Sequence, residues 1–182
     1  MDGRRREIII VFLMVSVMFA CILLWQALMP RGTEPSQIVN TLRIALPTPH
    51  YDSNISIEEA LLKRRSIREY TGEPLTLQQV SQLLWATQGI TDPSGYRTAP
   101  SAGALYPLEI YIVVGEVENI EKGVYKYKPH EHELVKVVDG DKREELAQAA
   151  QGQTSVEEGA INIVITAVYE RTTVRYGDRG IR

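Results

Sequence analysis

An uncharged apolar run near the amino terminus places the tightest limit on how this chain can fold. It extends over 22 residues, from Ile8 to Met29, and only Ser16 and Gln26 within it are clearly polar. As a helix it would be about 33 Å long at 1.5 Å per residue, enough to cross a hydrocarbon core of about 30 Å. The run therefore predicts one transmembrane helix at 8–29, preceded by a basic tail at 1–7.

The residues on either side of this run indicate how it would lie in a membrane. Arg4–Arg6 precede it, whereas only Arg31 and Glu34 follow it closely. Because basic residues favour the cytoplasmic side, the amino-terminal tail should be cytoplasmic and the later residues extracytoplasmic. A cleaved signal peptide or lipid attachment at Cys21 would be the alternatives, although signal peptides have apolar regions of only about 7–15 residues. We therefore expect a single-pass membrane protein anchored through Ile8–Met29.

The remaining sequence predicts one small domain joined to the run by a linker. Residues 30–53 are rich in proline and show little hydrophobic periodicity, which is typical of a tether. Folded sequence then covers 54–182. The single cysteine excludes a disulfide framework and a cysteine-rich metal site, and we expect no metal site. The net charge of −3 gives no excess of basic residues that would favour nucleic acid, so we expect no nucleic-acid partner.

Capping signals and apolar spacing predict the helices of this domain. A capping box at 56–59 starts a helix that ends at the basic run 63–65. A second box at 76–79 starts a helix that Gly89 ends. Four apolar side chains form the predicted buried face of that helix: Leu77, Val80, Leu83 and Leu84. A third helix is predicted over 141–152.

Runs of β-branched and aromatic residues predict the strands. Ile110–Val114 and Ile161–Val168 are continuous apolar runs, typical of strands that are buried on both faces. Val124–Lys128 and Leu134–Val138 predict a hairpin around a polar turn, whose His132 is interpreted as solvated. The pattern predicts an α+β fold with helices covering a central sheet. Because nothing follows the last strand to cover it, we expect the domain to be incomplete at its carboxyl end.

One basic cluster carries residue types that suit an anionic ligand. Arg64, Arg65 and Arg68 bring three guanidiniums close to the hydroxyl of Ser66. Such groups can make several charge-assisted hydrogen bonds to an oxyanion. Cations at the carboxyl end of a helix are also favourable without any ligand. The cluster by itself therefore leaves both interpretations open.

A second candidate segment consists of small residues ahead of the first buried strand. It contains Pro100, Ser101, Ala102 and Gly103, followed by Ala104. Small residues let the backbone approach a flat ligand closely, and they equally suit a tight turn that leads into a strand.

Taken in order, these segments resemble the amino-terminal part of the nitroreductase family of flavoproteins. The resemblance is strongest to the branch related to the azoline dehydrogenases, which form thiazole and oxazole rings. It covers Ser56 to about Arg182. The matching stretches are SIEEALLKRRSIREY, PLTLQQVSQLLWATQGI, RTAPSAGALYPLEIYIVV, GVYKY and INIVITAVYERTTVRYG.

The resemblance implies a mostly antiparallel nitroreductase-like sheet with flanking helices, and FMN bound at the interface of a homodimer. It implies that Arg64 binds the FMN phosphate with Arg65 beside it, and that Ser66 donates to the phosphate or ribityl chain. Arg68 would place a positive charge near the flavin pyrimidine edge, where it stabilises the reduced ring. Residues 100–103 would lie against the flavin of the partner subunit.

The activity implied by the resemblance is FMN-dependent oxidoreduction, with hydride transfer through flavin N5 by ping-pong exchange. NAD(P)H or the small-molecule substrate itself would supply the hydride. Ala102 and Ala104 replace polar residues that are common in the bacterial nitroreductase branch, which weakens the case for a nitroarene substrate. No catalytic acid or base can be named from the sequence. The alternatives are a truncated, non-enzymatic flavin-fold remnant or interaction module, and a reductive dehalogenase of the same family.

Overall fold

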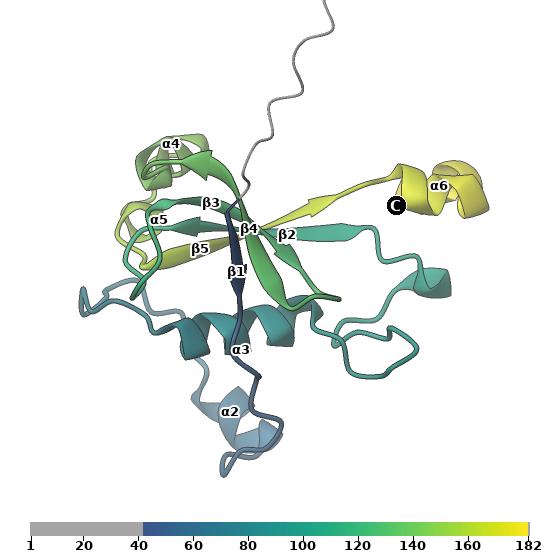
Figure 1. The fold of residues 1–182 in the computed structure, drawn as a ribbon, viewed down its shortest axis with the longest axis horizontal. Helices are drawn as coiled ribbons and strands as arrows, with labels where there is room; N and C mark the ends of the chain where they lie inside the picture. Colours follow the sequence, from purple (N-terminus) through teal and green to yellow (C-terminus); the bar gives the residue numbers. More distant parts are fainter. Residues whose placement is uncertain (1–41, 182) are drawn as a thin grey trace, which may run out of the picture. The chain divides into compact units, whose positions relative to one another are not determined.

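Five strands form one antiparallel sheet in the order β1-β4-β3-β2-β5 (Figure 1). The structure is a computed structural model that describes residues 42–181. The strands are β1 (Arg43–Ala45), β2 (Leu108–Val114), β3 (Gly123–Lys128), β4 (Glu133–Asp139) and β5 (Ile161–Ala167).

The helices of the described part are short, and α3 is the longest of them. They are α2 (Ile57–Lys63), α3 (Leu77–Gln88), α4 (Arg143–Ala149), α5 (Thr154–Glu157) and α6 (Glu170–Tyr176), with the 3-10 helices η1 (Ala102–Ala104) and η2 (Gly177–Ile181).

Two helices begin where their capping residues predict. Ser56 Oγ accepts the N–H of Glu59 at 3.1 Å at the start of α2. At the start of α3, Thr76 Oγ1 accepts the N–H of Gln79, and Gln79 Oε1 accepts the N–H of Thr76. These bonds satisfy backbone donors that have no partner inside the helix, so the predictions of both helix starts are confirmed.

The core lies between α3 and the sheet, which α3 crosses on one face (Figure 1). Val80 and Leu84 of α3 are fully buried. They belong to one apolar cluster with residues of the three central strands, including Ile110, Ile112, Val114, Tyr125, Tyr127 and Leu134. The apolar residues of β2 and β3 thus form the sheet side of the core, and they fix the position of the loop that leads into β2.

Two details of the predicted burial are wrong. Leu83 was expected on the buried face of α3, but 43% of it is exposed, whereas Val80 and Leu84 are fully buried and Leu77 packs against the core. The apolar run Ile161–Val168 was expected to be buried on both faces. It forms β5 at the edge of the sheet, where Ile165 is 56% exposed. An apolar run reflects residue preference, whereas burial requires a neighbouring layer that the run itself does not encode.

Part of the predicted tether belongs to the sheet. Arg43–Ala45 forms β1, which pairs with β4 in antiparallel register from Arg43 opposite Val135 to Ala45 opposite Glu133. Ile44 packs against the core cluster. Three residues are too few to show alternation, so this edge strand depends on pairing with β4, which lies about 90 residues later in the sequence.

No helix within residues 42–181 has the length and apolar character needed to cross a bilayer. The longest, α3, spans about 18 Å at 1.5 Å per residue, against a hydrocarbon core of about 30 Å. The predicted single-pass membrane location is therefore corrected, since the part of the chain that the structure describes contains no membrane span. The predicted span Ile8–Met29 and the tail at 1–7 lie outside the described residues.

Candidate functional site

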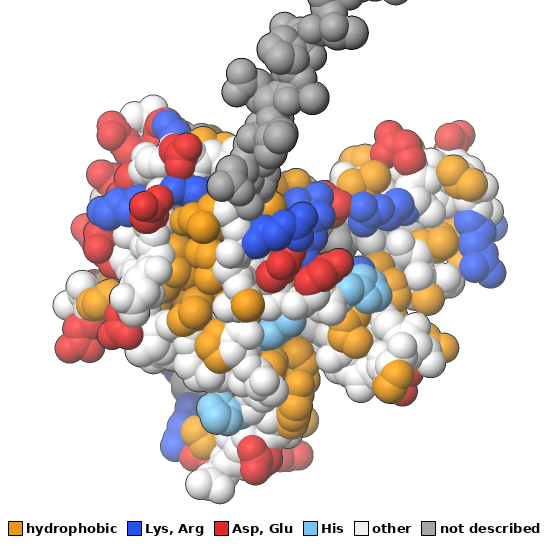
Figure 2. Space-filling model, viewed as in Figure 1, with side chains coloured by type: hydrophobic (Ala, Val, Ile, Leu, Met, Phe, Trp, Pro, Cys, Tyr) orange, Lys and Arg blue, Asp and Glu red, His pale blue; other side chains and the backbone are white. Residues whose placement is uncertain are grey.

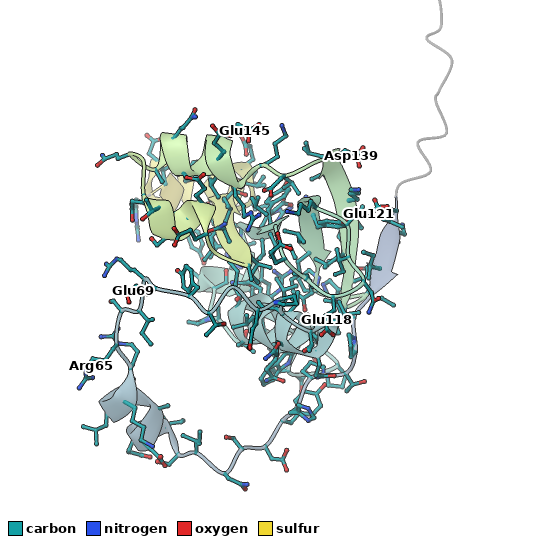
Figure 3. All side chains as sticks on the ribbon, turned by 90° about the vertical axis from the view of Figure 1, so that its left-hand side faces the viewer. Arg65, Glu69, Glu118, Glu121, Asp139 and Glu145 are labelled. Atoms are coloured by element: carbon teal, nitrogen blue, oxygen red, sulfur yellow. The ribbon has the colours of Figure 1, made fainter. Side chains whose placement is uncertain are left out.

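The basic cluster lies on an exposed, extended segment directly after α2. Arg64 caps the helix through its backbone N–H, which donates to Ala60 O at 3.0 Å. Arg65 turns back and donates to the carbonyls of Leu62 and Arg64 at 3.0 and 2.7 Å. Figure 3 shows Arg65 on the outer side of α2, which stands away from the sheet. The cluster is thus held at the edge of the domain, with its charged groups in solvent.

The remaining polar side chains of the cluster are available to a ligand. Within residues 42–181, the side chains of Arg64, Ser66 and Arg68 make no hydrogen bond or ion pair, and all three residues are exposed. The flanking apolar side chains are exposed as well: Leu62 is 75% and Ile67 is 71% exposed. A basic segment flanked by exposed apolar side chains is typical of a surface that a further molecule covers.

The second predicted segment is held in a defined turn. Ser101 Oγ accepts the backbone N–H of Tyr106 at 2.9 Å, and Ser101 O accepts the N–H of Ala104 at 3.0 Å. The Ser101 hydroxyl proton therefore remains free to donate to a ligand. Pro100, Ala102 and Gly103 are exposed beside it.

Gly103 is required where the turn meets α6. Its φ is +65°, and a Cβ built there would lie 2.7 Å from Tyr176 Oη and 2.9 Å from an Arg175 guanidinium nitrogen. These atoms are the ends of flexible side chains that can move aside, so the left-handed backbone is what favours glycine here. The sequence therefore permits a close approach between two segments that are about 70 positions apart.

This turn and α6 together line an open pocket of about 490 Å³, which we call the first hollow. Its size lies within the range of about 300–1,000 Å³ that is typical of small-molecule sites. One wall comes from the loop before β2, and the other comes from α6 and η2. Its lining includes Pro100, Ser101, Ala102, Tyr106, Tyr176 and Arg179.

A hydrogen bond at Thr172 holds the second wall in place. Thr172 is buried, and its Oγ1 lies 2.9 Å from Tyr169 O and 2.8 Å from Gly180 O. The hydroxyl thus ties η2 back onto α6 and keeps Arg179 at the rim of the hollow. Sequence reasoning missed Thr172, Tyr176 and Arg179, because they come from the last segment of the chain, and no local motif marks them.

The two predicted halves of the site do not meet within one chain. Residues 100–102 line the first hollow, whereas none of Arg64, Arg65, Ser66 and Arg68 does. α2 and η1 lie at different ends of the domain in Figure 1. A ligand that used both segments of one chain would have to span the domain.

The histidine that was interpreted as solvated is instead part of a partly buried hydrogen-bond network. His132 Nδ1 lies 2.9 Å from Tyr127 Oη, and His132 Nε2 lies 2.8 Å from Ser81 Oγ and 3.0 Å from Pro47 O. Burial lowers the pKa of His132 below its ordinary value of 6.5. This network joins the turn after β3 to α3 and to the segment after β1. Within residues 42–181 no group of three or more metal-ligating side chains is present.

The chain belongs to the nitroreductase family, whose family model matches residues 61–182. A protein of Methanocaldococcus jannaschii with a provisional nitroreductase name is 48% identical over 143 residues, covering 79% of this chain and 71% of that protein. The predicted family and its nitroreductase-like α+β sheet with flanking helices are confirmed.

Solved structures agree with this assignment. A provisionally named nitroreductase from Ralstonia eutropha superposes with a TM-score of 0.64 at 29% identity, covering 76% of this chain and 62% of that one. A chain of the Escherichia coli microcin synthetase McbBCD complex, solved with truncated pro-MccB17 bound, gives a TM-score of 0.51 at 25% identity. That match covers 76% of this chain and 56% of its own. The chain thus spans less than two thirds of these two structural relatives, and the microcin synthetase match fits the predicted branch.

Proposed function

We propose that this chain is an FMN-dependent oxidoreductase that works as a homodimer. Members of the nitroreductase family typically bind FMN and are typically dimers, which supports the proposal. When bound, FMN would supply reversible hydride exchange at its N5 atom, so that donor and acceptor can react in turn. The residues of this chain would bind, orient and shield the reacting groups.

The residues present fit FMN chemically. The phosphate is a dianion, and Arg64, Arg65 and Arg68 offer guanidinium donors with Ser66 as a further donor. The first hollow offers the apolar and small surfaces of Pro100 and Ala102, together with the free hydroxyl proton of Ser101. We assign the basic segment to the phosphate and ribityl chain, and residues 100–103 to the ring.

The distance between the basic segment and residues 100–103 is the observation that supports a homodimer. Because the basic segment of a chain does not line its own hollow, a second copy would have to bring the two together. The exposed apolar side chains of α2 would be covered in the same contact; Leu61 and Leu62 are 69% and 75% exposed. Burial of apolar surface is the dominant favourable term in such associations.

We place the activity in the branch related to the azoline dehydrogenases, with a small-molecule or peptide-borne heterocycle as substrate. The structural relative from the microcin synthetase complex was solved with a bound pro-peptide, which supports this choice. In this branch the substrate itself supplies the hydride; with NAD(P)H as donor, the same site would act as a reductase.

The decisive experiment measures flavin retention. The full chain is purified with added FMN, and its visible absorption is followed during dialysis and on reduction with dithionite. Replacing Arg64 and Arg68 with alanine together should weaken FMN binding at least about tenfold, because hydrogen bonds to charged groups contribute about 1.5–3 kcal/mol each.

The matched control is Arg43→Ala, which removes a guanidinium from β1, outside both segments. It should leave FMN binding unchanged. A colourless protein that ignores added FMN would contradict the proposal and would favour a non-enzymatic remnant of the fold. Equal retention by the double variant would contradict the assignment of the phosphate to the basic cluster.

A further inference from the structure

A second hollow lies next to the first and has a different character. It measures about 400 Å³ and shares Tyr106 and Leu108 with the first hollow as a common wall. Its other walls come from the start of β2 and from the turn between β3 and β4. Figure 2 shows basic and acidic side chains and a histidine gathered on this face around that turn.

Cations outnumber carboxylates in this second hollow. Four permanently charged cations line it: Arg97, Lys126, Lys128 and Arg171. The carboxylates are Glu109 and Glu131. Lys126 Nζ lies 2.5 Å and Arg171 Nη2 lies 2.6 Å from the Glu109 carboxylate oxygens. Glu109 is therefore fully used by these two partners, while Arg97 and Lys128 have no carboxylate partner within residues 42–181.

Arg97 is the group whose bonding is incomplete. One of its terminal nitrogens donates to Gln88 Oε1 at 3.2 Å, and its Cζ lies 4.5 Å from the centroid of the Tyr106 ring. The Nε atom of Arg97 is buried and finds no hydrogen-bond partner within residues 42–181. A buried donor without a partner is unfavourable, because it has given up its bonds to water.

The surroundings of Arg97 disfavour its charge as well. Burial and the nearby guanidinium of Arg171 lower the pKa of Arg97. Glu109 compensates the charge of Arg171, whereas no carboxylate within residues 42–181 compensates that of Arg97, so an anion beside Arg97 would be favourable. The stacked ring of Tyr106 holds the Arg97 guanidinium in place, so its donors are preorganised.

We propose that the second hollow binds an oxyanion, a carboxylate or a phosphate, held by Arg97 with Lys128 at the rim. This site is separate from the proposed FMN phosphate site at Arg64–Arg68, and its occupancy does not require flavin. Because the two hollows share a wall, a ligand with an acidic group in the second hollow could reach into the first. The inference thus goes beyond the proposed oxidoreductase activity and assigns a binding site to a different set of residues.

The test measures the binding of inorganic phosphate and of acetate to the full chain by isothermal titration calorimetry. Ionic strength is kept constant with potassium chloride, so that general screening does not contribute. Arg97→Gln should weaken binding of the preferred anion at least about tenfold, and Lys128→Gln should weaken it about threefold, because charge-assisted bonds are lost. Arg43→Gln, with the same loss of charge on β1, should change it less than about twofold.

Comparing the two anions identifies the chemistry of the ligand. Tighter binding of phosphate assigns a phosphate-bearing ligand, and tighter binding of acetate assigns a carboxylate. If Arg97→Gln fails to fold by circular dichroism, Arg97→Lys and Lys128→Gln carry the test. Binding that is equal in wild type and these variants would overturn the proposal, as would the absence of binding at millimolar concentrations of both anions.

A titration with added FMN tests this inference independently of the proposed function. The titration is repeated with FMN at saturation, which would occupy the proposed phosphate site at Arg64–Arg68. The part of the anion binding that Arg97→Gln removes should persist under these conditions, and its loss in the presence of FMN would show one shared site and overturn the inference. A protein that ignores FMN but binds an anion through Arg97 would overturn the proposed function alone.

Discussion

Glu109 is the acidic side chain on which the charges of the second hollow depend, and its replacement gives a quantitative test. Only 16% of its side chain is exposed, and both Lys126 and Arg171 contact it. The hydrogen bond from Lys126 is the largest cause that lowers the pKa of Glu109 from 4.5 to about 2. At about 1.36 kcal/mol per pKa unit, this difference corresponds to about 3 kcal/mol of stabilisation of the ionised form.

The variant Glu109→Gln should therefore lower the free energy of unfolding at pH 7 by about 2–3 kcal/mol, measured by urea denaturation. The sign with pH follows from the lowered pKa. The stabilisation is complete above pH 4.5, the ordinary value, and it is lost as the pH falls from there towards 2. Wild type and variant should thus converge in stability towards about pH 2.

A matched control is Glu118→Gln, an exposed carboxylate between β2 and β3, labelled in Figure 3. It should change stability by less than about 0.5 kcal/mol. Equal stability of wild type and Glu109→Gln at pH 7 would refute the reasoning, as would a gap that persists unchanged at low pH. The same variant raises the net charge of the second hollow and should strengthen phosphate binding there.

Three further outcomes are expected. Gly103→Ala and Gly140→Ala, at φ +65° and +82°, should each cost about 1–2 kcal/mol from the left-handed backbone, because the side-chain ends of Tyr176 and Arg175 beside Gly103 can move aside and Gly140 faces open space; thermal unfolding measures both. Leu62→Glu on the exposed face of α2 should abolish the dimer and FMN binding without loss of helix content, and a dimer that persists in sedimentation would contradict this. Burial lowers the pKa of His132 below 6.5, so below that pH the unfolded chain binds more protons than the folded chain, and stability should fall as the pH drops through 6.5. His132→Gln should reduce this dependence.

The local signals of the sequence predicted the elements well, because they act over three or four residues. The capping residues Ser56 and Thr76 make their bonds within one helical turn, so α2 and α3 begin where expected. The apolar runs that became β2, β3 and β4 were predicted to within two residues at each end. The family itself could be identified from the sequence because its motifs follow one another along the chain in order.

Burial and the assembly of the site were beyond such signals. Leu83 satisfies the helical spacing as well as Val80 does, yet only the sheet decides which of them is covered. His132 lies in a polar turn, and its partly buried hydrogen bonds form because Ser81 and Pro47 meet it from distant parts of the chain.

The sequence by itself determined the helix starts, the strand-forming runs, the family, and the residue types from which an anion and a flat ring could be bound. Only the tertiary structure decided that residues 100–103 face α6, that the basic segment stands apart from them, and that Arg97 lies in a hollow of its own. The physical reason is that capping and periodicity are properties of neighbouring residues. Hollows, edge strands and clusters of charged side chains arise from contacts between segments that are tens of residues apart.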